Sequence, residues 1–453
     1  MNWSAAKNWG FSPVDGAPLV ALRLVFAALV LFSTVRFASY GWIESQIVDP
    51  EVTFPFWIFA SVPRPGWWAA WSLFAAMAAG SLLMLGNRPR LGAAVFFVPF
   101  TFVELLDKTN YLNHYYFVSL MALLLAFLPS QRRDAAGVPR YARDLPKVLL
   151  TLVYFYAGIA KLHPEWIWDG MPLRIWLPQH NDFPVIGPLL ALPETAVLFS
   201  WGGLLFDLTA GFLLWSNRWR PWVYPVVVVF HVMTWCLFPI GVFPWVMIGC
   251  TTVFFSADFH RRWIAVATRK ELPAFRPEVY RWPSSNRGFI AAAFFLCVQL
   301  VVPWRYLAYP GELFWHEAGY RFSWRVMLIE KAGAAFFYAR DDQGREREVD
   351  LNAFLTPNQI KMMATQPDLL IQTAQWIERR DAEDGLGTEA VRAEVWVSLN
   401  GRRSQLFIDP FVDLTEVQDG PGQARHWVLP MDSVVTMSEY RRMKPELRAK
   451  AGW

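Results

Sequence analysis

Long apolar runs separated by short polar segments dominate the first two thirds of the chain. A helix that crosses a membrane needs about 20 consecutive, mostly apolar residues. Nine windows meet or nearly meet this requirement: 17–38, 66–86, 91–107, 112–129, 146–162, 194–216, 220–239, 242–257 and 288–304. The pattern therefore predicts a membrane α-helical bundle of about nine transmembrane helices, which occupies residues 1–304.

Lys and Arg between these windows predict how the bundle is oriented. They gather in four segments: 88–90, 130–147, 218–220 and 258–287. Because short cytoplasmic loops carry an excess of Lys and Arg, a cytoplasmic N-terminus accounts for all four segments at once. The same alternation places residues 305–453 outside the cytoplasm. The first window contains Arg23 and is not followed by a small-residue cleavage site, so we expect a retained helix and not a signal peptide.

Residues 305–453 carry more charge and show strand and turn patterns. An apolar stretch at 334–340, the turn Asp341-Asp342-Gln343-Gly344 and a polar stretch predict a hairpin. A second hairpin is predicted at 392–408, where Asn-Gly at 400–401 suits a type I′ turn. Thr-Pro at 356–357 predicts a helix that runs to about residue 383, with Thr as N-cap and Pro at the first position. These elements predict a C-terminal extracytoplasmic α+β, β-rich domain.

Composition supports a membrane protein and excludes several other classes. Hydrophobic residues make up 55% of the 453 residues and charged residues only 18%, whereas soluble proteins average about 25% charged. The 25 Trp residues fit the aromatic belts of a membrane protein. A disordered chain, a nucleic-acid-binding protein and an ordinary cytosolic enzyme are excluded. The basic segments are explained by contact with anionic lipids.

Two ionisable residues fall near the outer ends of predicted spans, where burial of charge is costly. Lys161 is either a lysine that reaches the headgroups or an amine held in apolar surroundings, which disfavour its ammonium form and make it a usable base. His114 lies among tyrosines and is either a hydrogen-bonded anchor or a catalytic group. The predicted topology brings both residues to the same face of the membrane.

Five further polar residues lie within or next to apolar windows. His231 is expected to be a neutral imidazole that donates to a backbone carbonyl of a neighbouring helix. Asp207 and Glu194 are interpreted as a structural polar pair inside the bundle. Glu104, with its neighbour Asp107, is expected to face water at the outer end of its helix.

The motifs of common soluble enzymes are absent from the sequence. There is no GxGxxG motif, P-loop, GxSxG or HExxH. Three Cys residues lie in apolar runs without metal-binding spacing. Phosphate chemistry and a metal site therefore have no support from the sequence.

Several blocks in order along the chain resemble the vitamin K-dependent gamma-carboxylase family, in a bacterial-type, HTTM-domain form. They are DKTNYLNH at 107–114, AGIAKLHPEW at 157–166, FHVMTWCLFPIGVFPWVM at 230–247, GYRFSW at 319–324, and VWVS with IDP at 395–398 and 408–410. The resemblance covers about residues 17–430. It implies the same architecture that the hydrophobic pattern predicts.

The resemblance also implies a reaction, catalysed by a carbon–carbon lyase. In the family, a lysine deprotonates vitamin K hydroquinone, which reacts with O2 and becomes a strong oxygen base on its way to the epoxide. That base removes a γ-proton from a peptide glutamate, and CO2 adds to the carbanion. The resemblance implies that Lys161 is the initiating base and that His114 assists at the glutamate. Tyr320 and Trp324 match positions near the glutamate, and His231, in the third block, is expected to line the substrate site.

The implied partners are a glutamate-containing peptide or secreted protein, membrane lipids and a quinone reductase that recycles the epoxide. The implied location is the cytoplasmic membrane of a bacterium. The chain departs from the animal enzymes after Trp324, where they carry a differently charged segment that contains His and Arg. Its outer domain has no Cys, so the disulfide of animal members cannot form. Both departures bear on the peptide substrate.

Two other functions share parts of this pattern. One is a non-catalytic quinone- or lipid-binding membrane protein on the same scaffold, and Lys161 and His114 favour an enzyme over it. The other is a small-solute transporter. Transporters commonly contain paired repeats and ionisable groups near the midplane. Here the ionisable candidates gather near one face and no repeat is visible in the sequence, which counts against transport.

Overall fold

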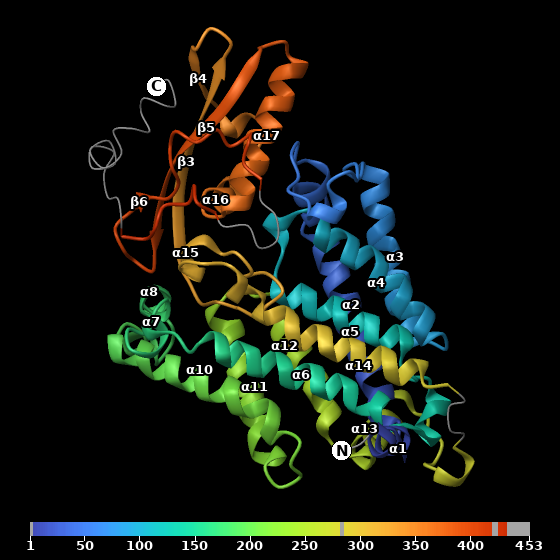
Figure 1. Ribbon diagram of the computed structural model, residues 1–453. Coiled ribbons are helices and arrows are strands. Elements are labelled where there is room, and N and C mark those ends of the chain that lie inside the picture. The colour runs from blue at the N-terminus through green and yellow to red at the C-terminus, as the bar shows by residue number, and fades with distance from the viewer. Residues whose placement is uncertain (1–2, 281–284, 419–424, 433–453) are drawn as a thin grey trace.

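A bundle of helices makes up most of the molecule, and a small antiparallel sheet lies at one end of it (Figure 1). The computed structural model describes residues 3–280, 285–418 and 425–432. The four-stranded sheet is built from residues after 330, and the helices of the bundle come before it in the chain. This arrangement agrees with the predicted combination of a helical part and an α+β part.

Each of the nine apolar windows contains a helix. The helices are α2 (Ala17–Ser39), α3 (Trp67–Leu85), α4 (Pro89–Leu106), α5 (Asn113–Phe127), α6 (Arg140–Ala160), α10 (Pro193–Leu213), α11 (Arg220–Leu237), α12 (Phe243–Thr251) and α14 (Arg287–Val301). Among the described residues, five segments are long and apolar enough to cross a membrane: α2, α3, α4, α10 and Arg287–Ala308. The chain is therefore a membrane protein by composition and length, while the count of nine spans stays a prediction.

The remaining helices are short or amphipathic. They are α1 (Trp3–Phe11), α7 (Pro164–Ile167), α8 (Leu173–Trp176), α9 (Gly187–Leu190), α13 (Ala257–Thr268), α15 (Leu313–His316), α16 (Pro357–Met363) and α17 (Pro367–Glu383). Two short strands, β1 (Pro13–Val14) and β2 (Val138–Pro139), pair antiparallel near α1.

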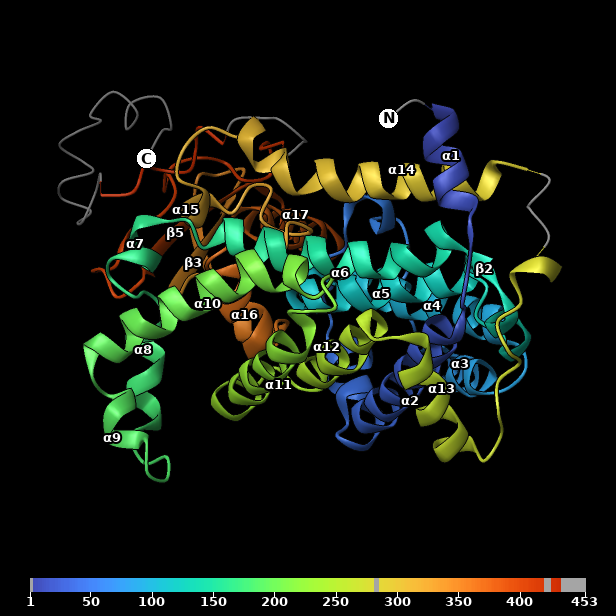
Figure 2. The ribbon, with the colours of Figure 1, turned by 90° about the horizontal axis from the view of Figure 1, so that it is seen from below.

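α14 lies along the outside of the bundle, beside α6 (Figures 1 and 2). Only 11% of its apolar window is buried inside the protein. Ile290, Phe294 and Val301 are exposed apolar side chains on this helix. Such a continuous apolar surface is suited to contact with lipid tails and not with water.

Glycine allows α6 and α10 to pack closely, which positions the site described below. A Cβ atom at Gly158 of α6 would lie 2.8 Å from the backbone nitrogen of Leu208. A Cβ atom at Gly211 of α10 would lie 2.9 Å from the Cα of Thr151. Small residues let helix backbones approach in membranes, where packing and not hydrophobic exclusion from water drives association. Larger residues at these two positions would push the helices apart.

The outer part of the chain forms a sheet with strand order β4-β3-β5-β6. Its strands are β3 (Lys331–Asp341), β4 (Glu346–Val349), β5 (Thr388–Leu399) and β6 (Gln405–Leu406), and all neighbours are antiparallel. Both predicted hairpins are confirmed. In the second, Asn400 and Gly401 have φ values of +50° and +75°, and a type I′ turn requires positive φ at both positions.

The prediction of one helix from 356 to about 383 is wrong in its continuity. The chain forms α16 and then α17, with a break before Pro367. Proline lacks the N–H that an internal helical position donates, and it disfavours helical geometry in the residue before it. The predicted start is confirmed, since the Thr356 hydroxyl accepts from the Gln359 backbone N–H and the Gln359 side chain accepts from that of Thr356.

Polar contacts join the sheet domain to one end of the bundle. The Asn113 side-chain amide at the start of α5 donates to the carbonyl of Arg325 at 2.6 Å. Gln359 of α16 donates to the carbonyl of Val52 at 2.7 Å and to the Asp107 carboxylate at 3.2 Å. The end of the bundle where α2 and α4 finish and α5 begins therefore faces the sheet domain.

Candidate functional site

A cavity of about 150 Å³ lies inside the bundle beneath the sheet domain, and we call it the lysine cavity. Its walls are mostly aromatic and aliphatic. They come from helices α5, α6, α7, α8, α10, α11 and α12, the residues next to them, and the segment 324–327. The lining residues are Asn113, His114, Val153, Tyr154, Ala157, Lys161, Trp166, Leu173, Phe199, Gly203, Asp207, Phe230, His231, Met233, Thr234, Leu237, Phe238, Ile240, Phe243, Met247, Trp324, Val326 and Met327. Concave apolar cavities with a few convergent polar groups are typical ligand sites.

Lys161 enters this cavity from the end of α6. The helix ends at Ala160 because Pro164 follows closely, and a proline restricts the residue before it. The lysine side chain, 9% exposed, lies across Gly203 of α10, where a Cβ atom would be 3.8 Å from Lys161 Cε. Its ammonium is also 5.2 Å from the centre of the Trp166 ring. The side chain is buried and paired with Asp207 inside the bundle, whereas a lysine that reaches the headgroups would extend from the surface.

The partner of Lys161 is Asp207, which sequence reasoning assigned to a different pair. Lys161 Nζ donates to Asp207 Oδ2 at 2.7 Å, and the two side chains are 9% and 6% exposed. Glu194, the expected partner of Asp207, is exposed at the start of α10. The pairing of Asp207 with Glu194 is therefore wrong, because the two residues are 13 positions apart on α10, which separates their carboxyl groups by about three and a half helical turns. The sequence did contain a signal for the true pair, since Lys161 and Asp207 are opposite charges that both lie inside apolar windows.

His114 also lines the lysine cavity, at the first turn of α5. Its ring stacks on Phe243, with centroids 4.9 Å apart. Within the described part of the chain, no hydrogen bond engages either ring nitrogen, so the anchoring role is not seen. The predicted meeting of Lys161 and His114 in one water-poor chamber agrees with the structure, although their chemical roles stay proposals.

His231 of α11 lines the same cavity, but its hydrogen bond differs from the predicted one. Its Nε2 lies 3.0 Å from the Tyr154 hydroxyl. The expected backbone carbonyl is thus replaced by a side chain of α6. The hydroxyl and the imidazole can exchange a hydrogen bond in either direction, depending on the tautomer.

The two residues predicted in the outer domain lie in different places. Trp324 lines the lysine cavity, stacks on Tyr116 with ring centroids 5.0 Å apart, and has a buried indole nitrogen without a hydrogen-bond partner. Tyr320 is outside the lining, with its ring 6.3 Å from that of Phe314. Burial raises the pKa of the Tyr320 phenol well above its usual value. The structure brings Lys161, His114, His231 and Trp324 together, but not Tyr320.

The two acidic residues expected to face water are buried instead. Glu104 and Asp107 are 4% and 3% exposed. Glu104 Oε2 accepts from the Ser119 hydroxyl at 2.5 Å, whereas its Oε1 has no partner within the described residues. Asp107 accepts from the backbone N–H of Thr109 at 2.8 Å and from its hydroxyl at 2.7 Å. The Asp-x-Thr spacing was a readable signal for this local turn.

Comparison with known protein families shows to which family the chain belongs. Residues 11–259 match the HTTM domain, and residues 284–434 match the vitamin K-dependent gamma-carboxylase, lumenal domain. The chain belongs to the vitamin K-dependent gamma-carboxylase family. No solved structure matches it. Together with the apolar helices, the match identifies a carboxylase-family membrane protein with an extracytoplasmic domain.

The lysine cavity fits the reduced quinone that the carboxylase family uses. A quinol is a flat apolar ring with two hydroxyl groups. The cavity supplies aromatic walls, an ammonium–carboxylate pair at Lys161 and Asp207, and a buried indole N–H at Trp324 that has no partner in the described residues. Buried polar groups are normally hydrogen-bonded, so an unpaired indole N–H beside a cavity is suited to a ligand oxygen. No group of His, Cys, Asp and Glu residues in the described chain could hold a metal ion.

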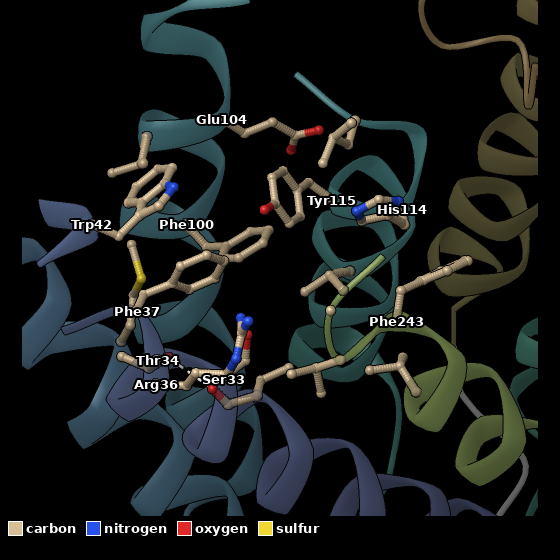
Figure 3. Close-up of a pocket in the computed structure, with 18 of the residues that line it drawn as sticks. Ser33, Thr34, Arg36, Phe37, Trp42, Phe100, Glu104, His114, Tyr115 and Phe243 are labelled. Carbon is tan, nitrogen blue, oxygen red and sulfur yellow. Dashed lines mark hydrogen bonds between the residues drawn. The ribbon is translucent and has the colours of Figure 1, made fainter. Parts of the chain in front are cut away.

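A second cavity, of about 170 Å³, adjoins the first in this carboxylase-family bundle, and we call it the arginine cavity. Figure 3 shows Arg36 of α2 and Glu104 of α4 pointing toward the space between the helices, with His114 and Phe243 on another side. His114, Ile240 and Phe243 line both cavities. These three side chains therefore form the partition between the two chambers.

Proposed function

We propose that this protein is an integral-membrane, vitamin K hydroquinone-dependent gamma-glutamyl carboxylase, which couples quinol epoxidation by O2 to carboxylation of peptide glutamate with CO2. Membership of the gamma-carboxylase family supports the class of reaction. The observation that carries the proposal is the buried Lys161–Asp207 pair in an apolar cavity that His114 also lines. In this proposal Lys161 and His114 are the catalytic residues.

Asp207 gives Lys161 a way to act as a base. An ammonium group cannot accept a proton, so the lysine must first lose one, and Asp207 Oδ2 is 2.7 Å away. We propose that Lys161 passes a proton to Asp207 and takes up a hydroxyl proton of the bound quinol at Nζ. The pair then carries one more proton than before, and its net positive charge balances the negative charge left on the quinol oxygen. A low-dielectric cavity strengthens this compensation.

The apolar walls of the cavity serve to exclude water. Bound reduced vitamin K supplies, through its reaction with O2, the strong oxygen base that removes the γ-proton of glutamate. Water would compete for such a base, and a dry chamber avoids this loss. Phe238, Phe243 and Trp324 are among the apolar side chains that line the lysine cavity. Trp324 then has two roles in the proposal, as part of the apolar wall and as the donor of an indole N–H to a ligand oxygen.

In the proposal, His114 acts on the second substrate, the peptide glutamate. Since its ring nitrogens make no hydrogen bond within the described residues, one of them can donate to or accept from a substrate atom. We assign to it the assisting role at glutamate and to His231, held by Tyr154 at 3.0 Å, a role in shaping the quinol site. Tyr320 lies outside the cavity lining, so its proposed contact with the glutamate substrate is with the peptide outside the chamber.

The distribution of Lys and Arg between the apolar windows supports the proposed setting. The N-terminus is cytoplasmic, the sheet domain is outside, and the peptide or secreted protein approaches from the sheet side of the bundle. For a bacterial protein this places the enzyme in the cytoplasmic membrane. A quinone reductase in the same membrane would return the epoxide to the reduced form.

The experiment that tests the proposal uses the full chain purified into lipid nanodiscs. The protein is incubated with reduced vitamin K and O2, and the epoxide is quantified by chromatography. A second reaction adds a glutamate-containing peptide and labelled CO2, and carboxylated product is counted. Formation of both products is expected. Saturable binding of reduced vitamin K without epoxide would reject the enzyme and leave the quinone-binding alternative.

A further inference from the structure

The arginine cavity lies at the end of the bundle that faces the sheet domain. Arg36 is near the end of α2, Glu104 near the end of α4 and His114 at the start of α5. Because Asn113 and Asp107, which bond to the sheet domain, sit at the same end, the chamber adjoins the side from which an extracytoplasmic ligand would come. Its chemistry differs from that of the lysine cavity, since it contains an arginine and no lysine.

Arg36 is a cation without an anionic partner. No carboxylate forms an ion pair with its guanidinium among residues 3–280, 285–418 and 425–432. The group lies 5.0 Å from the centre of the Tyr40 ring, and its Nη1 is 3.8 Å from where a Cβ atom at Gly241 would be. Figure 3 shows its nitrogens directed into the cavity. A planar guanidinium with donors exposed in a cavity is suited to bind a carboxylate through two parallel hydrogen bonds.

Glu104 contributes an unused acceptor to the same chamber. Ser119 holds one of its carboxyl oxygens at 2.5 Å, and this bond orients the group. The other oxygen is buried and has no partner in the described residues. Arg36 and Glu104 therefore favour a ligand that carries both a carboxylate and an N–H donor. A glutamate residue within a peptide has both.

The partition connects this chamber to the proposed quinol site. His114 and Phe243 stack on each other and line both cavities. A side chain that lies in the arginine cavity with its carboxylate toward Arg36 presents its γ-carbon within the same chamber as His114. The γ-carbon then lies on one side of His114 and the lysine cavity lies on the other.

We infer that the arginine cavity receives the glutamate side chain of the peptide substrate, with Arg36 as the partner of its carboxylate and Glu104 as an acceptor for peptide N–H. This inference rests on the proposed function for the identity of the peptide. The two substrates then occupy separate chambers and meet at His114. The alternative source of an anion for Arg36 is a lipid headgroup, since the residue lies near the end of a membrane helix.

The test measures peptide binding without turnover, so that it does not depend on the proposed reaction. A short glutamate-containing peptide and its glutamine counterpart are titrated onto the full chain in nanodiscs of neutral lipid, without quinol. We expect the glutamate peptide to bind at least tenfold more tightly than the glutamine peptide. Arg36→Gln should remove this preference and Arg36→Lys should reduce it, because lysine keeps the charge but loses the two-pronged geometry.

Arg64→Gln is the matched control, since Arg64 is an exposed arginine of the loop between α2 and α3 and does not line the cavity. It should leave the preference unchanged. An unaltered preference in Arg36→Gln with a native melting temperature would overturn the inference. So would loss of the wild-type preference when anionic lipid is added, because Arg36 would then serve headgroups. If the preference depends on Arg36 but no carboxylated product ever forms, the proposed function fails and the binding site stands.

Discussion

Two buried clusters of charge in this molecule have opposite characters. At the junction with the sheet domain, Asp368 is bound by Arg321 at 2.7 Å and by Lys108 at 3.0 Å. In the lysine cavity, Lys161 and Asp207 form a single pair, and the surrounding walls are apolar. The Asp368 cluster has two cations for one carboxylate and lies where α17 meets the segments that carry Lys108 and Arg321. The Lys161–Asp207 pair has one cation for one carboxylate and lines the lysine cavity.

The two clusters differ in whether their members can exchange a proton. Burial acts to raise the pKa of the Asp368 carboxyl, but Arg321 and Lys108 outweigh it and hold the pKa well below its usual range. Such an acid stays ionised and cannot exchange protons near neutral pH. A one-to-one pair can transfer a proton between its own members at no change in total charge. The lysine cavity therefore retains the capacity for proton transfer that the junction has lost.

The largest effect is expected from Lys161→Ala. If the lysine is the initiating base, quinol epoxidation falls by about three orders of magnitude or more, the upper range for loss of a general base. Membrane insertion and folding should persist. Epoxide is measured by chromatography on protein in nanodiscs. Lys147→Ala is the matched control, because Lys147 is a buried lysine of the same helix that pairs with Asp144 at 3.4 Å and does not line the cavity. Epoxidation by Lys161→Ala within tenfold of wild type would defeat the assignment.

Asp207→Asn tests whether the lysine needs its carboxylate. The substitution keeps the shape of the side chain but removes the proton acceptor, so turnover should fall by roughly ten- to a thousandfold. Binding of the quinol should change less than turnover. Asp207→Glu, which restores a carboxylate, should recover part of the rate. A normal rate and an unchanged pH profile in Asp207→Asn would show that the aspartate only packs against the lysine.

Asp368→Asn should affect stability rather than chemistry. Removal of one partner from a buried cluster leaves the other charges uncompensated, at a cost of about 3–5 kcal/mol. Arg321 and Lys108 would both lose their carboxylate. The free energy of unfolding, followed by denaturant or thermal unfolding of the sheet domain, measures this loss. A decrease in the free energy of unfolding of less than about 1 kcal/mol would show that the cluster stabilises the fold no more than an exposed salt bridge does.

The same comparison predicts a dependence on pH. The folded-state pKa of Asp368 lies below its unfolded value, so its contribution to stability is fully present above the unfolded pKa, about 4. The contribution is lost as pH falls through the folded pKa. The difference in melting temperature between wild type and Asp368→Asn should thus be constant from neutral pH to about pH 5 and shrink in stronger acid. A difference that already disappears at about pH 6 would contradict the assignment to Asp368.

The smallest effect is expected at the ion pair between Arg402 of the sheet domain and Glu165 of α7. Arg402 Nη2 lies 2.5 Å from Glu165 Oε1, and the two side chains are 34% and 14% exposed. Burial acts to raise the pKa of Glu165, but hydrogen bonds from Arg402 and Asn400 outweigh it and lower the value. Partly exposed ion pairs contribute roughly 0–1 kcal/mol. Arg402→Ala should lower the free energy of unfolding by no more than this amount, and a loss as large as that of Asp368→Asn would show that the two junctions are not distinct.

The sequence pattern predicted the helices and the turn of the second hairpin, whose second strand, β6 (Gln405–Leu406), is shorter than the predicted 402–408. Each apolar window contains a helix, because the length and composition that suit a membrane also stabilise helical backbone. Asn400-Gly401 specified its own turn, because the required φ values are local properties of those residues. The helix after Thr356 was predicted too long, although Pro367 was a local signal for the break.

The contacts within the candidate site could not be predicted, because they join residues that are far apart in the sequence. Lys161 and Asp207 are 46 residues apart, and either could have faced lipid, water or another helix. Gly158 and Gly211 let α6 and α10 approach, and this approach together with the rotation of each helix selects the pair. Glu104 was expected in water for the same reason, since its burial depends on α5 and its Ser119.

From the order of its residues alone, this chain could be assigned a helical membrane part, a family and the two residues Lys161 and His114. Helix formation, turns and family blocks are encoded within short stretches, so they are readable there. The partner of Lys161, the burial of Glu104 and the division into two chambers at His114 came from the folded bundle. Those features depend on how distant helices rotate and pack, which is settled by all of their contacts at once.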